Sequence, residues 1–203
     1  PLTAAAIEQM AASAKPDGFN DPHLGLQWHM VNNGDLAKTK FVAGADVNVE
    51  KAWELCTGNP SIIVAVLDEG VDFSHPDLKG SMWVNEKEIW RSAEDNDGNG
   101  YAGDVYGYNF AAQSGIISTN GRYDTGHGTH VAGTVAAVNN NGIGISSIAG
   151  GDGSTKGVKI MSCQIHSGSN GATGDVSAKA IRYAADMGAS ILQCSWGYPA
   201  GYY

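Results

Sequence analysis

The chain has 203 residues, 42% of them hydrophobic and 16% charged, and its formal net charge is −9. This composition predicts a globular protein with a core and excludes an intrinsically disordered one. The negative charge argues against a nucleic-acid-binding protein, which needs a basic face, and suits calcium binding or simply a soluble exterior. No run reaches the ~18 apolar residues that a membrane-spanning helix needs, so no membrane span is expected. The three cysteines, Cys56, Cys163 and Cys194, have no zinc-site spacing and are expected to be free or buried thiols.

The first residues are expected to lie outside the folded core. Residues 1–20 are rich in alanine and end in the loop-forming stretch KPDGFN, so we interpret them as a leader or linker before a domain at 21–203. The chain begins at Pro1 without the basic and apolar segments of a signal peptide, which indicates a processed or trimmed start. A signal peptide removed earlier is compatible with such a start.

The next segments read as a helix and a buried strand. A helix is predicted at 46–58, starting at Asp46 or Asn48 and followed by an apolar stripe. The run SIIVAVLDEG at 61–70 is rich in β-branched residues and predicts a buried parallel strand that ends at an acid, Asp68.

The second half of the chain continues the alternation of helices and strands. Residues 85–125 are rich in Gly, Asn and Asp and predict a long surface loop. A helix, a strand, a further helix and a last strand are predicted at 127–140, 157–165, 175–188 and 189–197. The later helix is expected to have Asp175 as its N-cap and Gly188 as its C-cap. This order predicts an α/β fold with a parallel sheet and right-handed crossovers.

Polar residues gather where two predicted strands end. Function in such sheets collects at the carboxyl ends of strands, and both Asp68 and the segment Ser195–Gly197 fall there. A carboxylate at the mouth of an apolar strand is costly unless it is paired or hydrogen-bonded. Asp68 could therefore cap a turn, bind another group, or orient a histidine.

The stretch DTGHGTHVAGTVAA, residues 124–137, holds two histidines three positions apart. A zinc-binding helix carries its histidines at i and i+4 with a glutamate between them, and this stretch has neither feature, so a metal site is not favoured. His130 is expected to pack in the core. The glycines around His127 allow close backbone approach and leave its ring accessible at a helix start.

Two ungapped motifs and several flanking segments resemble the subtilisin-like serine peptidases, the subtilases. The motifs are VAVLDEGVDFSHPDL and HGTHVAGTVAAVNNNGIG, and the flanking segments are NDPHLGLQWHM, NDGNGYAGDVYGYNF, GVKIMSCQIHSG and ASILQCSWG. The resemblance runs from about residue 20 to the end, in the family's order. It implies a three-layer α/β sandwich with a mainly parallel sheet flanked by helices, incomplete in this chain.

The resemblance assigns two members of a catalytic triad. Asp68 would be the acid, and His127 would be the general base that takes the proton of a serine. Glu69 departs from the family's usual small Thr or Ser, and we expect its side chain to point away from His127. No GTSMA-like string and no G-x-S-x-G elbow occurs, so the serine and the asparagine of the oxyanion hole are expected beyond residue 203. Ser195 matches a segment that lines the substrate cleft and not the nucleophile.

Substrate and calcium contacts also follow from the resemblance. The residues expected to line the substrate cleft are Gly168, Ser169, Ser195, Trp196 and Gly197, with Trp196 as an ordinary rim aromatic as the alternative. One calcium site would use the side chains of Asp21, Asp77 and Asn140 and the carbonyls of Val138, Ile143 and Ile145. A second would use Asp95, Asp97, Asn99 and Asp104 in a loop that lacks the closing glutamate of an EF-hand, with a plain turn-rich loop as the alternative.

The expected function is therefore that of a serine endopeptidase with a structural Ca²⁺ and a peptide or protein substrate. The remaining part of the catalytic domain, from the same gene or a second chain, would be its partner, and the 203 residues alone would be inactive. The expected location is outside the cell or in the cell envelope, either periplasmic or lipid-anchored. The alternative is a non-catalytic, calcium-binding subtilase-like fragment or pseudoenzyme that acts in protein interaction.

Overall fold

A computed structural model describes residues 18–34, 42–119, 124–166 and 172–197. Contacts between Cα atoms divide the chain into two compact units. The first unit comprises Pro1–Pro60 and Gly133–Val158, and the second comprises Ser61–Ala132 and Lys159–Tyr203.

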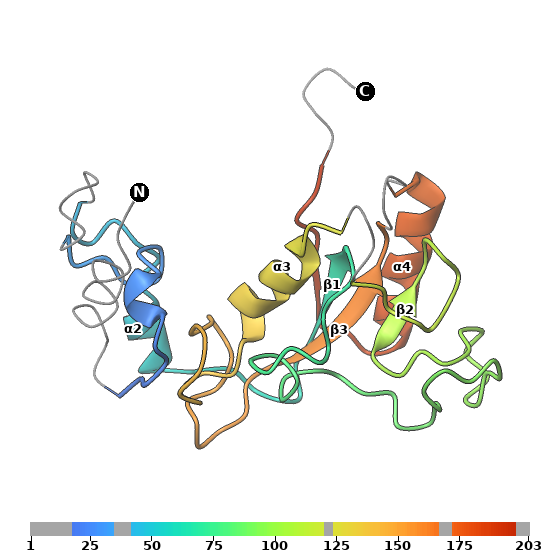
Figure 1. Cartoon of the computed structure of the whole chain (residues 1–203), viewed down its shortest axis with the longest axis horizontal. Helices are drawn as coiled ribbons and strands as arrows, with labels where there is room; N and C mark the ends of the chain where they lie inside the picture. Colours follow the sequence, from blue (N-terminus) through green and yellow to red (C-terminus); the bar gives the residue numbers. More distant parts are fainter. Residues whose placement is uncertain (1–17, 35–41, 120–123, 167–171, 198–203) are drawn as a thin grey trace. The chain divides into compact units, whose positions relative to one another are not determined.

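The second unit is built on a parallel sheet of four strands in the order β2-β3-β1-β4, and Figure 1 labels the first three of these. The strands are β1 (Ile63–Asp68), β2 (Gly107–Asn109), β3 (Lys159–Gln164) and β4 (Ile191–Gln193). β1 pairs with β3 along its whole length, and this register sets Asp68 opposite Gln164. The predicted parallel sheet is therefore confirmed.

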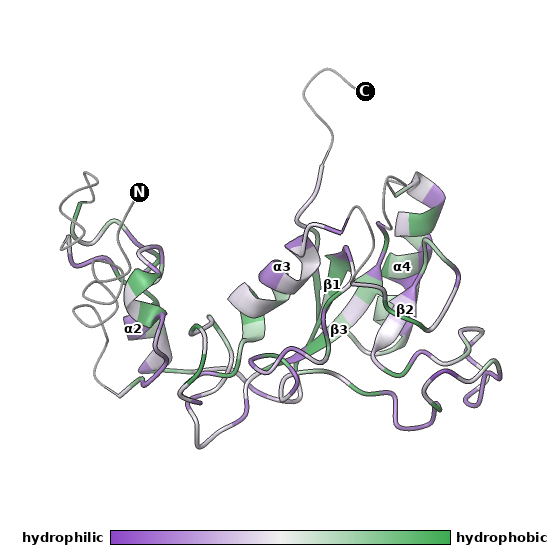
Figure 2. Ribbon diagram, viewed as in Figure 1, coloured by the Kyte–Doolittle hydropathy of each residue, from purple (hydrophilic) through white to green (hydrophobic). Residues whose placement is uncertain are grey.

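The core of this unit lies between the sheet and helix α4 (Gly174–Asp186), which packs against β1 and β3. Apolar residues recur on one side of α4, and Figure 2 shows them alternating with hydrophilic ones along the helix. The buried cluster contains Ala65, Leu67, Phe110, Met161, Cys163, Ile165, Ala180, Tyr183 and Ala184. Burial of these side chains holds the carboxyl ends of β1 and β3 in place.

Three predicted details of this unit are wrong. Thr173, not Asp175, is the N-cap of α4, because its side chain accepts a hydrogen bond from the backbone N–H of Val176. The last strand is only three residues long. The predicted surface loop contains β2, which begins at Gly107 with a φ of +113°. A Cβ on Gly107 would overlap the carbonyl of Ser162, so only glycine allows this pairing.

The first unit contains the 3₁₀ turn η1 (Leu24–Leu26) and the short helix α2 (Val49–Trp53). Its core consists of Leu24, Met30, Val31, Val49 and Trp53, with Phe19 packed against it. Phe19 stacks on Trp53 with ring centroids 4.3 Å apart, while residues 1–17 of the predicted leader lie outside the described residues. Helix α2 is thus shorter than the helix predicted at 46–58. Asp46 lies before it, in a turn where its side chain accepts hydrogen bonds from the backbone N–H groups of Asn32 and Asn48.

Helix α3 (His127–Ala136) begins in the second unit and ends in the first. Among the described residues, no helix combines the length and the apolar character needed to cross a bilayer. Cys56 and Cys194 are exposed and Cys163 is buried, all three as free thiols, as the sequence predicted.

Candidate active site

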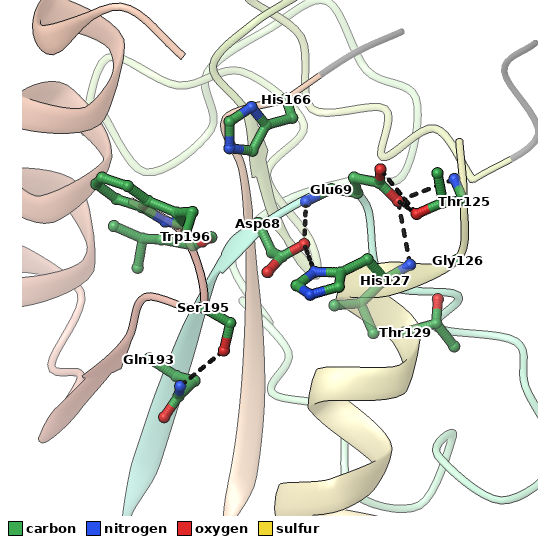
Figure 3. A network of polar contacts seen from close by, with 12 residues as sticks. Asp68, Glu69, Thr125, Gly126, His127, Thr129, His166, Gln193, Ser195 and Trp196 are labelled. Atoms are coloured by element: carbon green, nitrogen blue, oxygen red, sulfur yellow. Dashed lines mark hydrogen bonds and ion pairs between the residues drawn. The ribbon is translucent and has the colours of Figure 1, made fainter. Parts of the chain in front are cut away.

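The end of β1 and the start of α3 bring Asp68 and His127 together (Figure 3). The Nδ1 atom of His127 lies 2.7 Å from Oδ1 of Asp68, and the same oxygen accepts a hydrogen bond of 2.7 Å from the backbone N–H of Glu69. Asp68 is 2% exposed, whereas half of the His127 side chain is exposed. A buried carboxylate therefore holds one ring nitrogen of an accessible imidazole.

Glycines allow this close approach. A Cβ on Gly128 would overlap the carbonyl oxygen of Glu69, and a Cβ on Gly70 would overlap that of Ser118. Gly126, directly before α3, has a φ of +78°, a conformation that side chains disfavour. Of the two glycines next to His127, Gly128 is thus required by the packing of the helix start onto the strand end, and Gly126 by its positive φ.

The imidazole is poised to act as a base. The hydrogen bond to Asp68 raises the pKa of His127, burial lowers it, and the charges of Asp68 and Glu69 add to the rise. An ionised Asp68 only accepts, so neutral His127 must carry its proton on Nδ1. The other ring nitrogen, Nε2, then presents a lone pair, and this is the arrangement of a general base with an orienting acid.

Glu69 does not point away from His127, contrary to the expectation from sequence. Its carboxylate accepts a hydrogen bond of 3.1 Å from the backbone N–H of His127 and bonds of 3.0 Å from the backbone N–H and the hydroxyl of Thr125. The reason is that the first N–H groups of a helix lack partners within the helix and attract a carboxylate.

His130 is exposed and does not pack in the core, so this expectation is wrong as well. The buried side of α3 carries Gly128, Ala132 and Ala136 at a spacing of four residues. His130 lies two positions from Gly128, about 200° around the helix at 3.6 residues per turn.

A sequence profile described as "Subtilase family" matches residues 59–202, which include both Asp68 and His127. The chain belongs to the subtilase family. The resemblance inferred from the sequence motifs is therefore confirmed.

Known proteases are similar to this subtilase over most of its chain. Subtilisin-like protease 1 of Plasmodium vivax is 36% identical over 183 residues, which cover 89% of this chain and 25% of that protein. Fervidolysin of Fervidobacterium pennivorans is 36% identical over 199 residues, which cover 94% of this chain and 24% of that protein. A protease of Pseudoalteromonas arctica PAMC 21717 of known structure shares 33% identity at a TM-score of 0.54, over 90% of this chain and 47% of that chain. This subtilase chain thus spans about a quarter of the length of the first two relatives, and the expected α/β fold is confirmed.

The segment predicted to line the cleft of the subtilase follows β4. The Oγ atom of Ser195 accepts a hydrogen bond of 2.9 Å from Nε2 of Gln193, and Nε1 of Trp196 donates one of 2.7 Å to the carbonyl of Leu67 in β1. Trp196 and Gly197 are exposed. Gly168 and Ser169 lie outside the described residues.

In the subtilase's predicted second calcium loop, three carboxylates come together. Oxygens of Glu88, Asp95 and Asp97 lie within 4.8 Å of one another, which suits a hard cation such as Ca²⁺. Glu88 was not predicted, because it lies seven positions before the D-x-D-x-N pattern, and only its position in the fold reveals it.

The other two predicted ligands of this loop face each other and helix α4. The Oδ2 atom of Asp104 accepts hydrogen bonds from Nδ2 of Asn99 at 2.9 Å and from the hydroxyl of Tyr183 at 2.6 Å. Burial raises the pKa of Asp104, although these hydrogen bonds partly offset the effect. Asp104 is fully buried and anchors the loop to α4.

The first predicted calcium site draws on residues from both units. Asp21 and Asn140 belong to the first unit, together with Val138, Ile143 and Ile145, whereas Asp77 belongs to the second. The carboxylate of Asp21 is buried and accepts hydrogen bonds from the backbone N–H of Asn140 at 2.8 Å and from the hydroxyl of Ser146 at 2.6 Å. This arrangement ties the start of the first unit to the loop after α3, and calcium binding there stays a prediction.

Proposed function

We propose that the protein carrying this chain is a serine endopeptidase that hydrolyses peptide bonds through an Asp-His-Ser triad. The observation that carries the proposal is the 2.7 Å contact between Nδ1 of His127 and the buried Asp68. Membership of the subtilase family supports the assignment of a serine protease. The serine and the oxyanion-hole asparagine are proposed to come from chain beyond residue 203.

In the proposed reaction, Nε2 of His127 takes the proton of the serine hydroxyl as the oxygen attacks the substrate carbonyl. The imidazolium that forms is stabilised by Asp68, which stays ionised, and the proton then passes to the leaving amine. The acyl group is now bound to the serine. A water molecule gives a proton to His127 and attacks this ester, and His127 returns the proton to the serine oxygen as the acid product leaves. Asp68 also fixes the ring orientation, so His127 loses little freedom when the substrate binds.

The substrate is proposed to be an extended peptide or protein segment. Its backbone would pair with the segment of Ser195, Trp196 and Gly197 and with Gly168 and Ser169, in the manner of strand addition to an exposed edge. A secreted or cell-envelope location and assembly with the rest of the catalytic domain belong to the same proposal.

Ca²⁺ is proposed as a structural ion. Glu88, Asp95 and Asp97 would hold it in the loop before β2, because their carboxylate oxygens lie within 4.8 Å of one another and hard oxygen ligands suit Ca²⁺. Such an ion would stabilise the loop and take no part in the proton transfers. The alternative, a non-catalytic calcium-binding protein of the same fold, keeps this ion site and lacks the triad chemistry.

The test is the substitution His127→Ala in the full-length protein. We expect the turnover of a peptide substrate to fall by about 10⁴-fold or more, because the general base is lost. The matched control is His130→Ala, which removes an exposed histidine from the same helix and should leave turnover nearly unchanged. Near-normal turnover of His127→Ala would refute the triad assignment and favour the non-catalytic alternative.

A further inference from the structure

Asp68 and Glu69, two neighbouring residues at the end of β1, bind different atoms of His127. Asp68 bonds to the ring at Nδ1, and Glu69 bonds to the backbone N–H of the same residue at 3.1 Å. Both oxygens of Glu69 also accept from the hydroxyl of Thr125, at 3.1 and 3.0 Å (Figure 3). The backbone N–H of Thr125 donates a further bond of 3.0 Å to Oε2. The side chain of Glu69 therefore fastens the first turn of α3 to the strand that carries the triad acid.

The charge of Glu69 suits this place. A helix start presents unpaired N–H groups and the positive end of the helix dipole, and both favour a carboxylate. Burial raises the pKa of Glu69, but the hydrogen bonds from Thr125 and His127 outweigh burial and leave it below the ordinary value. The group is thus ionised, and an acceptor only, across the neutral range.

A second carboxyl group, that of Asp124, interacts with Glu69. Burial raises the pKa of Asp124, while the N–H of Gly126 lowers it and Glu69 raises it further. The Oδ2 atom of Asp124 is buried and has no hydrogen-bond partner among the described residues. The two pKa values are thus shifted in opposite directions, downward for Glu69 and upward for Asp124.

We propose that Glu69 is a positioning residue for the general base, and that it fixes the backbone of His127 while Asp68 fixes the ring. The proposal rests on the proposed function of His127. A general base must meet its proton donor within hydrogen-bond reach, and a displacement of about 1 Å can cost ~10²-fold in rate. Without the contact from Glu69, the first turn of α3 can shift relative to β1 while the imidazole keeps its hydrogen bond to Asp68.

The experiment uses the full-length protein with Glu69→Gln, Glu69→Ala and Glu69→Asp. The matched control is Glu86→Gln, which removes the same charge from an exposed side chain of the same unit. Rates are divided by the concentration of active sites titrated with a fluorophosphonate, so that unfolded protein is not counted. Hydrogen exchange of the backbone amides of Thr125 and His127 is measured in parallel.

We expect Glu69→Gln and Glu69→Ala to lower kcat about tenfold with KM nearly unchanged, because the chemistry and not the peptide contacts is affected. The acidic limb of the pH–rate profile should move to lower pH in both, because the charge of Glu69 raises the pKa of His127. Glu69→Asp should keep the position of this limb and lose part of kcat, since it keeps the charge but reaches less far. Exchange at the Thr125 and His127 amides should become faster in Glu69→Gln and Glu69→Ala.

An unchanged kcat and an unchanged acidic limb in both Glu69→Gln and Glu69→Ala would overturn the proposal. An effect of equal size in Glu86→Gln would do the same, because it would show a general charge effect. His127→Ala separates this result from a failure of the proposed function. If His127→Ala is nearly as active as the wild type, the triad assignment fails first, and with it the role of Glu69.

Discussion

At the scale of single residues, the site depends on which atoms of His127 are held. Asp68 is buried and binds the ring, and Glu69 is partly exposed and binds the backbone. The two acids are neighbours in sequence, so their side chains leave the end of β1 in different directions. These two acids contact Nδ1 and the backbone N–H of His127, so neither of them occupies Nε2, the nitrogen that is proposed to take the proton of the serine.

The charge of Asp68 has a measurable effect on His127. Asp68→Asn weakens the hydrogen bond that raises the pKa of His127 and removes the charge that adds to the rise, so this pKa should fall toward its ordinary value. In the wild type, protonated His127 stabilises the fold, and this contribution is present at low pH and lost as the pH rises through the pKa of the folded protein. Asp68→Asn should lose part of this stabilisation at low pH.

The measurement is an NMR titration of ¹⁵N-labelled histidine in the full-length protein. Asp72→Asn serves as the control, because its side chain bonds to Ser74 and not to the imidazole. A pKa of His127 that stays at the wild-type value in Asp68→Asn would show that the contact between the two side chains does not control the protonation of the ring.

At the scale of elements, the sequence predicted the long apolar strand and the long helix well. β1 and β3 lie within the predicted ranges because their side chains are buried on both faces and read as apolar runs. β2 was missed because three residues in a Gly- and Asp-rich stretch carry no periodic pattern. Its position depends on pairing with β3, which no local signal reveals.

In the site, too, sequence motifs predicted some residues, whereas contacts between distant segments became visible only in the structure. Asp68 and His127 were predicted from their motifs, and the structure brings them together. The contact of Glu69 and the exposure of His130 depend on the angle at which α3 meets the strand end, which no motif encodes. Glu88 was missed for the same reason, since its carboxylate reaches Asp95 and Asp97 only after the loop has folded.

The loop before β2 is the element in which calcium should matter. A chelator should lower the melting temperature of the full-length protein by several degrees, because a ligand at ~100 times its Kd stabilises the native state by about 2.7 kcal/mol. Glu88→Gln or Asp95→Asn should reduce this calcium-dependent shift.

Thermal unfolding with and without Ca²⁺ measures the effect, with Glu94→Gln as a control at an exposed position of the same loop. An unchanged midpoint on chelation would remove the calcium proposal. A shift that persists in both loop variants and disappears in Asp21→Asn would assign the ion to the other predicted site.

At the scale of the whole molecule, the chain carries the proposed acid, Asp68, and the proposed base, His127, on one unit. Both residues lie on elements of the second unit, and the parallel sheet holds them at its carboxyl edge. The chain spans about a quarter of the length of Plasmodium vivax subtilisin-like protease 1 and of fervidolysin. We therefore propose that these residues form one part of a larger catalytic domain.

The central claim is that Asp68 and His127 activate a serine that lies outside these 203 residues. The most direct measurement is to label the full-length protein with a fluorophosphonate and to locate the modified serine by peptide mapping. The account predicts one labelled serine, beyond residue 203, and no labelling of the variant His127→Ala. A label on Ser195, or on any other serine of these 203 residues, would contradict it.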